Sequence, residues 1–268
     1  MNVRIQHGWY SRISSDNTDL NSGQPVIFLW NERILREWQA KSEKPAVVIG
    51  APFVMLRRSL GIVQSVSARG TIAFPQHSTT NNESVYDVVK YCQELKSLPE
   101  KCKPITICLH YKDPVTHKRA FSDYGFHTVS AGHSRQPNAG FFRRFYQLLS
   151  QHRFTTSNDL GSYTFYAVEM GIPFFLHGHS VELRNKESGS PLQRGDTYYS
   201  LRELFVGLTD EISHEQREAV MSEIGSNAIP TADVLRKMLY RYLRKDMKSY
   251  PARAARLPFQ AYRQLRDS

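Results

Sequence analysis

Small polar residues gather where a helix is expected to begin, within residues 155–176. The segment reads as a polar loop, a helix, and then a glycine and a proline before an apolar strand. Ser157, Asn158 and Ser162 lie near the expected helix start, where backbone N–H groups lack intrahelical partners and the helix dipole adds positive charge. Such a helix start can bind a phosphate group. The alternative is that Ser157 or Asn158 serves only as a helix N-cap.

Four histidines lie within three residues of the ends of expected strands: His77, His110, His133 and His177. The carboxyl ends of parallel strands meet at one edge of a sheet, where ligands bind. Imidazoles at that edge could donate to phosphate oxygens or act as a base near neutral pH. Each histidine is equally compatible with an ordinary loop position. His177 and His179 form the closest pair for a metal, but no carboxylate or cysteine with ligand spacing accompanies them, so we expect no metal site.

The common motifs that hold phosphates or activate nucleophiles are missing from the chain. No G-x-x-x-x-G-K-[ST], G-x-G-x-x-G, G-x-S-x-G or H-E-x-x-H motif occurs, and no D-x-D pair occurs. A phosphate group would therefore have to be held by backbone N–H groups, hydroxyls, imidazoles and arginines.

Length and composition indicate a globular chain with a buried core, since the 268 residues are 40% hydrophobic and 22% charged. Cys92, Cys102 and Cys108 have no paired spacing, which favours a reducing compartment over a disulfide framework or a zinc knuckle. Residues 1–7 lack the apolar core of a signal peptide. The longest apolar run, 46–56, is too short to span a bilayer.

Positive charge is concentrated at the C-terminus. Residues 233–268 carry ten Lys/Arg and three Asp, so +7 of the net charge of +10 lies there. One interpretation is a terminal helix that packs on the core and exposes a basic face. The other is attraction to an anionic membrane surface or a polyanionic substrate. No nucleic-acid-binding motif occurs elsewhere, so we expect no nucleic-acid partner. The expected apolar face of the helix comprises Val234, Leu235, Met238, Leu239, Tyr242 and Leu243.

Strands alternate with helices along most of the chain, which predicts an α/β fold with a Rossmann-like, doubly wound parallel sheet and helices on both faces. The C-terminal tail is expected to be helical. The expected strands are 3–5, 25–30, 45–49, 71–74, 105–109, 127–130, 154–156 and 174–176, and the expected helices are 31–40, 84–96, 141–150, 200–206, 213–224 and 231–247.

Residues from His7 to His177 resemble the GT-B-fold glycosyltransferases of bacterial surface and capsular polysaccharides, a group that includes Kdo and CDP-glycerol-type transferases. Gln6-His7-Gly8-Trp9 is similar to the His-Gly loop that faces the interdomain cleft. Phe74-Pro75-Gln76-His77-Ser78 looks like the end of the first strand of the nucleotide-binding half. The segment 156–173 resembles the serine-containing loop and helix that hold the donor phosphate.

This resemblance implies site residues. His7 would be the catalytic base, and Glu169 would bind the donor ribose or sugar, although the usual upstream acidic partner is missing. No metal and no cofactor beyond the nucleotide-sugar donor would be needed. The donor phosphate would be bound by His77, Ser78, His133, Ser157, Asn158, Gly161 and Ser162.

The resemblance also implies an organisation and a function. We expect an incomplete N-terminal Rossmann-like half in residues 1–65 on the acceptor side, a nucleotide-sugar-binding half in 66–190, and a helical, basic region in 191–268. The first strands of a full GT-B N-terminal half would be missing. The implied activity is metal-independent transfer of a sugar or polyol phosphate from a nucleotide-activated donor to a polysaccharide or lipid-linked glycan acceptor. The protein would be cytoplasmic, with residues 233–268 able to touch the inner face of the plasma membrane.

Other functions fit the same residues. A non-catalytic nucleotide- or glycan-binding remnant of a GT-B enzyme would bind nucleotide without turnover. An epimerase-like GT-B enzyme would act on a nucleotide sugar without an acceptor.

Overall fold

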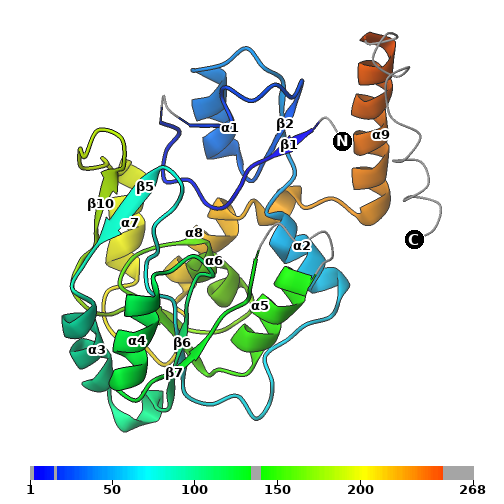
Figure 1. Ribbon diagram of the computed structural model, residues 1–268. Coiled ribbons are helices and arrows are strands. Elements are labelled where there is room, and N and C mark those ends of the chain that lie inside the picture. The colour runs from blue at the N-terminus through cyan, green and yellow to red at the C-terminus, as the bar shows by residue number, and fades with distance from the viewer. Residues whose placement is uncertain (1–2, 15–16, 134–139, 250–268) are drawn as a thin grey trace, which may run out of the picture.

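Two parallel sheets, one above the other in Figure 1, form the framework of the computed structural model. The structure describes residues 3–14, 17–133 and 140–249, with only the backbone described for 243–249. The smaller sheet is built from the N-terminal residues and the larger sheet from the middle of the chain. The domain boundaries given above remain predictions.

The smaller sheet has the order β1 (Arg4–Ile5), β2 (Ile27–Leu29), β3 (Ala46–Val48), with parallel pairing. Helix α1 (Glu32–Gln39) follows β2 and begins at Asn31, whose side chain accepts a hydrogen bond from the backbone N–H of Ile34 at 2.9 Å. Helix α2 (Pro52–Ser59) follows β3 and begins with a proline at its first position. Helix α2 is not among the helices predicted from the sequence.

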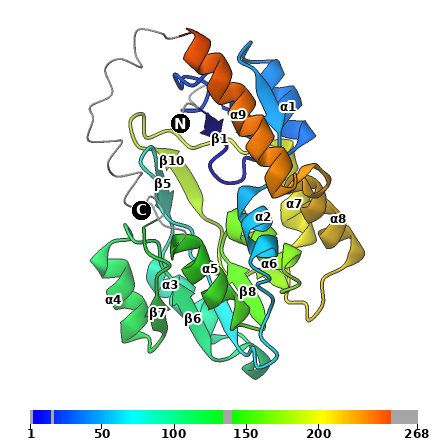
Figure 2. The same cartoon turned by 90° about the vertical axis from the view of Figure 1, so that its right-hand side faces the viewer.

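The two faces of this sheet are covered by helices from opposite ends of the chain. Ile27 and Leu29 pack with Ile34 and Trp38 of α1. Val26 and Phe28 point to the other face and pack against α9 (Ala232–Ser249) through Leu235, Met238, Leu239 and Tyr242. Figure 2 shows α9 lying along this part of the molecule.

The interpretation of α9 as a helix packed on the core is therefore confirmed for its described side chains. One residue assigned to the apolar face is wrong: Val234 is 47% exposed. The side chain of Leu243 lies outside the described residues.

The larger sheet is fully parallel and has the strand order β7-β6-β4-β8-β9. The order reverses between β4 and β8, so the crevice between them is the topological switch point, where ligands bind in open α/β sheets. The strands are β4 (Thr71–Ala73), β6 (Ile105–Cys108), β7 (His127–Val129), β8 (Phe154–Ser157) and β9 (Phe174–Leu176).

Helices cover both faces of the larger sheet. Helices α3 (Val88–Lys96) and α4 (Val115–Asp123) pack on one face, and α5 (Gly140–Ser150) and α6 (Ser162–Glu169) pack on the other. Helices α7 (Asp196–Leu204) and α8 (His214–Glu223) extend the second layer, and the short 3-10 turns η1 (Glu100–Cys102) and η2 (Ser226–Ala228) complete the helical elements of the described residues. The predicted α/β class, with parallel sheets flanked by helices and a helical C-terminal region, is confirmed.

One predicted helix starts too early. Residues 84 and 85 belong to β5 (Asn82–Val85), which pairs in antiparallel fashion with β10 (Glu182–Asn185). Helix α3 begins only at Val88, after Asp87, whose side chain accepts a hydrogen bond from the backbone N–H of Lys90 at 3.0 Å. The partner strand lies far away in the sequence, and neither strand is apolar, so periodicity alone could not reveal the pair.

The chain crosses between the sheets where two glycines meet. Gly50 and Gly225 both have positive φ values, 72° and 61°. A Cβ atom at Gly225 would overlap the carbonyl oxygen of Trp30, and the N–H of Ala51 donates to the carbonyl of Ile224 at 2.8 Å. Only glycine allows this backbone conformation and this close approach.

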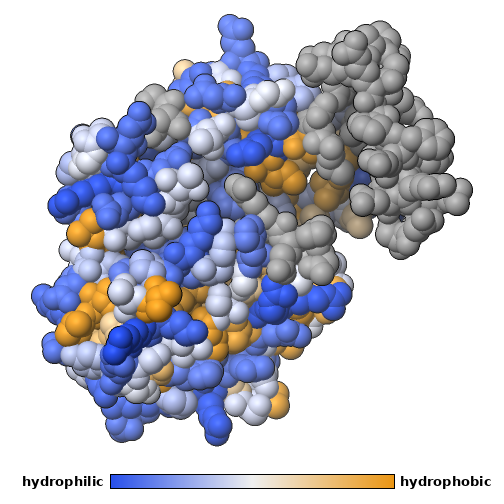
Figure 3. All heavy atoms as spheres, in the orientation of Figure 1, coloured by the Kyte–Doolittle hydropathy of each residue, from blue (hydrophilic) through white to orange (hydrophobic). Residues whose placement is uncertain are grey.

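The outer surface is mostly hydrophilic in the view of Figure 3, with hydrophobic patches in a recess of the upper half and across the lower half. Cys92, Cys102 and Cys108 are buried and free. Among the described residues, no helix combines the length and apolar character needed to cross a membrane.

Candidate functional site

A cavity of about 410 Å³ lies between the two sheets. The loops after β1, β4, β6 and β7 and the first residues of α6 contribute to its wall, which places it at the switch point of the larger sheet. No Asp, Glu, Lys or Arg occurs among the described residues that line it. Its wall consists of Ile5, Gln6, His7, Gly8, Trp30, Pro52, Phe53, Phe74, Pro75, His77, Cys108, Leu109, His110, Ser130, Ala131, Gly132, Phe141, Phe142, Phe145, Ser162, Tyr163 and Tyr166.

His7 is an exposed wall residue on the loop after β1, and hydrogen bonds on both sides hold this loop in place. The buried Gln6 side chain donates to the carbonyl of Gly8 at 2.9 Å and accepts from the N–H of Trp30 at 2.9 Å. The indole of Trp9 donates to Glu223 at 2.7 Å. The imidazole of His7 is therefore presented to the cavity from a fixed backbone.

Ser162 connects the two sheets at the cavity wall. It is the first residue of α6, and its Oγ accepts a hydrogen bond from the backbone N–H of Trp9 at 2.9 Å. Gly161 precedes the helix, and a Cβ atom there would come within 2.6 Å of the Tyr163 ring. Gly161 thus leaves room for the Tyr163 ring, and Gly8 of the His7 loop, whose Cβ would lie 3.1 Å from the Ser162 Oγ, allows the close approach of the two segments.

His77 and His110 form a stacked pair in the wall. Their rings lie 4.2 Å apart between centroids, with planes 11° from parallel. Burial, together with smaller effects of the neighbouring His110 and His7, lowers the pKa of His77 from 6.5 to about 4. Burial also lowers the pKa of His110, with added effects of Lys112 and His133. Two unit charges about 4 Å apart would repel each other by about 4 kcal/mol at an effective dielectric constant near 20, so the two rings do not both carry a positive charge.

His133 lies next to this pair. Its ring is 4.2 Å from the ring of Tyr111, which is 4.5 Å from the ring of His110. A guanidinium is also close, because Arg144 donates from Nε to the carbonyl of Ala131 at 2.7 Å. Arg144 of α5 thus lies close to the loop after β7 that carries His133, but neither of these two residues lines the cavity.

Ser157 and Asn158 lie behind the wall and support it. Ser157 is fully buried, and its hydroxyl donates to the carbonyl of Phe74 at 2.6 Å and lies 2.9 Å from the Tyr163 hydroxyl. Asn158 accepts the N–H of Gln76 at 2.9 Å, while its Nδ2 is buried without a hydrogen-bond partner among the described residues. Neither side chain lines the cavity.

Ser78 and Glu169 also lie outside the cavity wall. The Ser78 hydroxyl accepts the N–H of Ser84 at 3.0 Å. Glu169 ends α6, about 10 Å along the helix axis from Ser162. Its carboxylate pairs with Arg57 of α2 at 2.6 Å and with Arg58 at 3.0 Å. The carboxylate of Glu169 thus holds α2 against α6, and its contact with the donor ribose or sugar remains a prediction.

His177, the fourth strand-end histidine, has a different environment. Its Nε2 lies 2.7 Å from the carbonyl of Glu94, and the Nδ1 of His179 lies 2.8 Å from the Glu94 carboxylate. Both histidines thus bind helix α3. The part of the chain that the structure describes contains no group of three or more His, Cys, Asp or Glu residues that could hold a metal ion.

The sequence reasoning missed the aromatic part of the wall, which includes Phe53, Phe141, Phe142 and Tyr166. Phe53 belongs to α2, a helix that was not predicted, so nothing placed it near the site. Asp159 was missed as well: it pairs with Arg194 and accepts the Tyr198 hydroxyl at 2.7 Å. In the sequence, the feature that could have drawn attention to Asp159 is the continuous polar run that it forms with Ser157 and Asn158.

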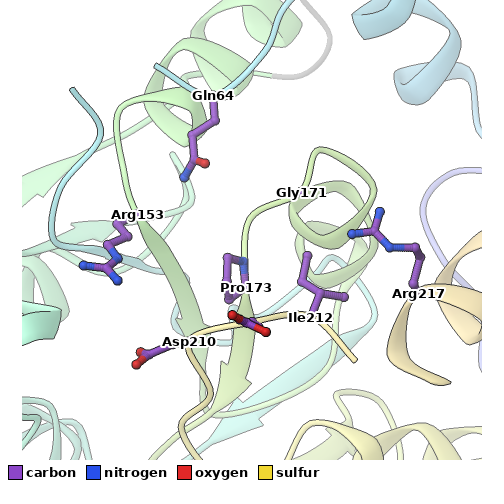
Figure 4. A pocket seen from close by; sticks show the side chains of 8 residues that line it. Gln64, Arg153, Gly171, Pro173, Asp210, Ile212 and Arg217 are labelled. Atoms are coloured by element: carbon purple, nitrogen blue, oxygen red, sulfur yellow. The ribbon is translucent and has the colours of Figure 1, made fainter. Parts of the chain in front are cut away.

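A second, open cavity of about 380 Å³ lies at the opposite edge of the larger sheet, near the amino ends of β8 and β9 (Figure 4). Arg153 and Arg217 contribute to its wall together with Asp210 and Glu211. Asp210 also forms an exposed ion pair with Lys101 at 2.8 Å. None of the predicted site residues lies here.

No protein-family model matches the chain, and no curated protein matches it in sequence. Solved structures of the wall teichoic acid polymerase TagF are similar to it. One is 12% identical with a TM-score of 0.43, covering 84% of this chain and 59% of that chain. A variant of TagF is 13% identical with a TM-score of 0.46, covering 92% and 68%.

The Glycosylation Associate Protein (Gap123) complex from Streptococcus agalactiae is 13% identical with a TM-score of 0.38, covering 91% of this chain and 47% of that chain. In a further TagF structure, the match spans 58% of the TagF chain. These similarities are too distant to support an inference about activity. The proposed activity therefore rests on the geometry of the site.

Proposed function

We propose that this chain is a glycosyltransferase-like protein that transfers a sugar or polyol phosphate from a nucleotide-activated donor to a surface or capsular polysaccharide acceptor. One observation carries the proposal: His7 of the smaller sheet meets His77 and Ser162 of the larger sheet in one cavity at the switch point. A base would thus face a phosphate-binding edge across a shared space.

The donor phosphates would be bound at the start of α6. Backbone N–H groups of the first turn point out of the helix, and the helix dipole adds positive charge there. The Ser162 hydroxyl and the Gly161 backbone lie at this helix start, and His77 and His133 come from neighbouring loops. Hydroxyl, imidazole and backbone donors suffice for this role, so the proposal uses no metal and no cofactor.

His7 would act as the general base. Its ring would take the proton of an acceptor hydroxyl while the oxygen forms a bond to the anomeric carbon, or to phosphorus for a polyol phosphate donor. The bond to the departing nucleotide breaks in the same reaction, and its electron pair stays on the phosphate oxygen. The donors at the start of α6 would stabilise this charge.

The acceptor and the membrane contact are also part of the proposal. The exposed face of α9 bears Arg236, Lys237 and Arg241. This basic face supports peripheral contact with an anionic membrane at the inner side of the plasma membrane, where a polysaccharide or lipid-linked glycan acceptor would be reached.

The test is calorimetric titration with UDP-glucose, GDP-mannose and CDP-glycerol, with and without magnesium, followed by transfer assays with the donor that binds. We expect His7→Ala to lower transfer 10²- to 10⁴-fold while leaving donor affinity nearly unchanged. Ser162→Ala should weaken donor binding. His214→Ala is the matched control, because this histidine is 79% exposed on α8. Full activity in both His7→Ala and Ser162→Ala would refute the site.

A second candidate is a non-catalytic nucleotide- or glycan-binding protein. It is favoured by the contrast between the five-stranded larger sheet and the smaller sheet, whose β1 has two residues. This candidate predicts saturable donor binding that is indifferent to His7→Ala and no turnover with any acceptor.

A further inference from the structure

The stacked imidazoles of His77 and His110 lie in the cavity wall at the ends of adjacent strands, β4 and β6. We infer that they form a proton-linked anion site: binding of the donor diphosphate places one proton on the pair, which makes His110 a binding residue in addition to His77. This inference rests on the proposed function and deepens it.

Apart from Asp113, the titratable groups that surround the pair among the described residues are cationic or neutral. His7 approaches from the β1 loop, His133 from the β7 loop through Tyr111, and Lys112 from the β6 loop. Tyr163 of α6 lies in the same wall. No carboxylate lines the cavity among the described residues, so nothing there stabilises an imidazolium before an anion arrives.

The nearest carboxylate in this loop is Asp113, and it is directed at the backbone. It accepts the N–H of His110 at 2.7 Å. Burial raises the pKa of Asp113 from 3.8 to about 6, with an opposing effect of that hydrogen bond. Because Asp113 becomes protonated as the pH falls, the negative charge that it places near the two rings decreases in acidic solution.

A bound diphosphate would reverse this balance. A negative group within hydrogen-bond reach favours the charged form of an imidazole. Only one proton fits, because the ring centroids are 4.2 Å apart and two imidazolium ions would repel each other. The protonated ring could then donate from its outward nitrogen to the anion, while the neutral ring stacks on it.

The inference predicts a pH dependence with a defined sign. The ligand binds the protonated pair, so affinity should fall as the pH rises. In the interval between the free and the ligand-bound pKa, the loss is about tenfold per pH unit, since one proton is taken up per ligand.

The experiment is calorimetric titration with UDP-glucose, GDP-mannose and CDP-glycerol at pH 7, in buffers of different ionisation enthalpy. These intact donors carry diphosphate diesters that do not titrate near neutrality, so any proton uptake belongs to the protein. We expect close to one proton per ligand. His77→Asn and His110→Asn should each reduce the uptake toward zero and flatten the pH dependence, whereas His214→Asn should match the parent chain.

The outcomes separate this inference from the proposed function. Donor binding with no proton uptake and a flat affinity between pH 6 and pH 8 overturns the inference and leaves the proposed function intact. Uptake that survives in His77→Asn and His110→Asn but disappears in His133→Asn or His7→Asn also overturns it. Failure of all three donors to bind contradicts both. Unfolding midpoints of the variants establish that they are folded.

Discussion

Two groups of loops at the same edge of the larger sheet use their polar residues in opposite ways. The end of β8 and the loop after it direct Ser157 and Asp159 into the protein, where their side-chain oxygens contact backbone groups, Tyr163, Arg194 and Tyr198. The loops after β4 and β6 direct His77 and His110 into the cavity wall. A polar sequence at a strand end therefore does not by itself identify a ligand site. The Ser157 hydroxyl and the Asp159 carboxylate have hydrogen-bond partners within the protein, whereas the rings of His77 and His110 line the cavity.

The strongest test of the supporting role is Asp159→Ala. The carboxylate accepts hydrogen bonds from Tyr198 at 2.7 Å and from the N–H of Leu160 at 2.8 Å, and it pairs with Arg194. Its removal leaves a largely buried guanidinium without its counter-charge, so we expect a loss of about 3 kcal/mol in the free energy of unfolding, measured by urea denaturation.

Asp210→Ala is the matched control for that variant. Asp210 pairs with Lys101 at the surface, where both side chains are close to half exposed, so the loss should be below about 1 kcal/mol. Equal losses in the two variants would contradict the supporting role of Asp159.

Glu169→Gln tests whether a polar residue at the other end of α6 also has a supporting role. The neutral amide cannot neutralise Arg57 and Arg58, so we expect the free energy of unfolding to fall by about 2 kcal/mol. Affinity of the folded variant for UDP-glucose or CDP-glycerol, measured by calorimetry, should not change. Glu182→Gln, in an exposed pair with Arg184, is the control. Weaker donor binding with unchanged stability would indicate that Glu169 contacts the donor.

The pH dependence of stability tests the cavity side. His77 has an ordinary pKa of 6.5 and a folded pKa of about 4, so the unfolded chain binds more protons between these values. Stability should therefore decrease as the pH falls through this window, by at most about 2 kcal/mol from pH 6.5 to pH 5 for this one group.

His77→Gln should flatten that slope by the contribution of one proton, whereas His214→Gln should not. Asp113, whose pKa is raised to about 6, contributes with the opposite sign below that pH. Its contribution cancels when variant and parent are compared by urea denaturation at each pH. An unchanged slope in His77→Gln would show that this imidazole titrates normally in the folded protein.

The smallest expected effect belongs to Ser157→Ala. The variant leaves the carbonyl of Phe74 and the N–H of Asp159 without the Ser157 hydroxyl, and we expect a loss of about 1 kcal/mol in unfolding free energy. Ser59→Ala, at the exposed end of α2, should lie within about 0.5 kcal/mol of the parent. A large loss of donor affinity in Ser157→Ala without any loss of stability would place its hydroxyl in the binding site after all.

Much of the framework could be predicted because local signals agreed with the final packing. The runs at residues 71–74, 105–109 and 174–176 are apolar and end in turn residues, and each became a buried parallel strand. Because the carboxyl ends of parallel strands meet at one edge of a sheet, His77 and His110 were expected to lie close together, and their rings do stack. Helix α2 was not predicted because Gly50 and Pro52 are residue types that commonly interrupt regular structure, although a proline in the first turn can begin a helix.

Side-chain direction could not be predicted in the same way. Ser157 and Ser162 are the same residue type five positions apart, yet one hydroxyl is buried under the wall and the other lies at the cavity. The role of Glu169 could likewise not be predicted, because its ion-pair partners Arg57 and Arg58 belong to α2 and come close to it only in the tertiary structure. Hydrophobic periodicity predicts which residues are buried. It does not predict the hydrogen-bond partner of each polar atom.

The packing of α9 on the first sheet has a consequence for protein synthesis. The ring of Phe28 in β2 meets that of Tyr242 in α9, with centroids 5.8 Å apart, so one face of the N-terminal sheet stays bare until the last helix has been made. The larger sheet contains all its strands between Thr71 and Leu176 and needs no such wait. Folding on the ribosome should therefore begin in the middle of the chain, and its first residues should acquire their full core last.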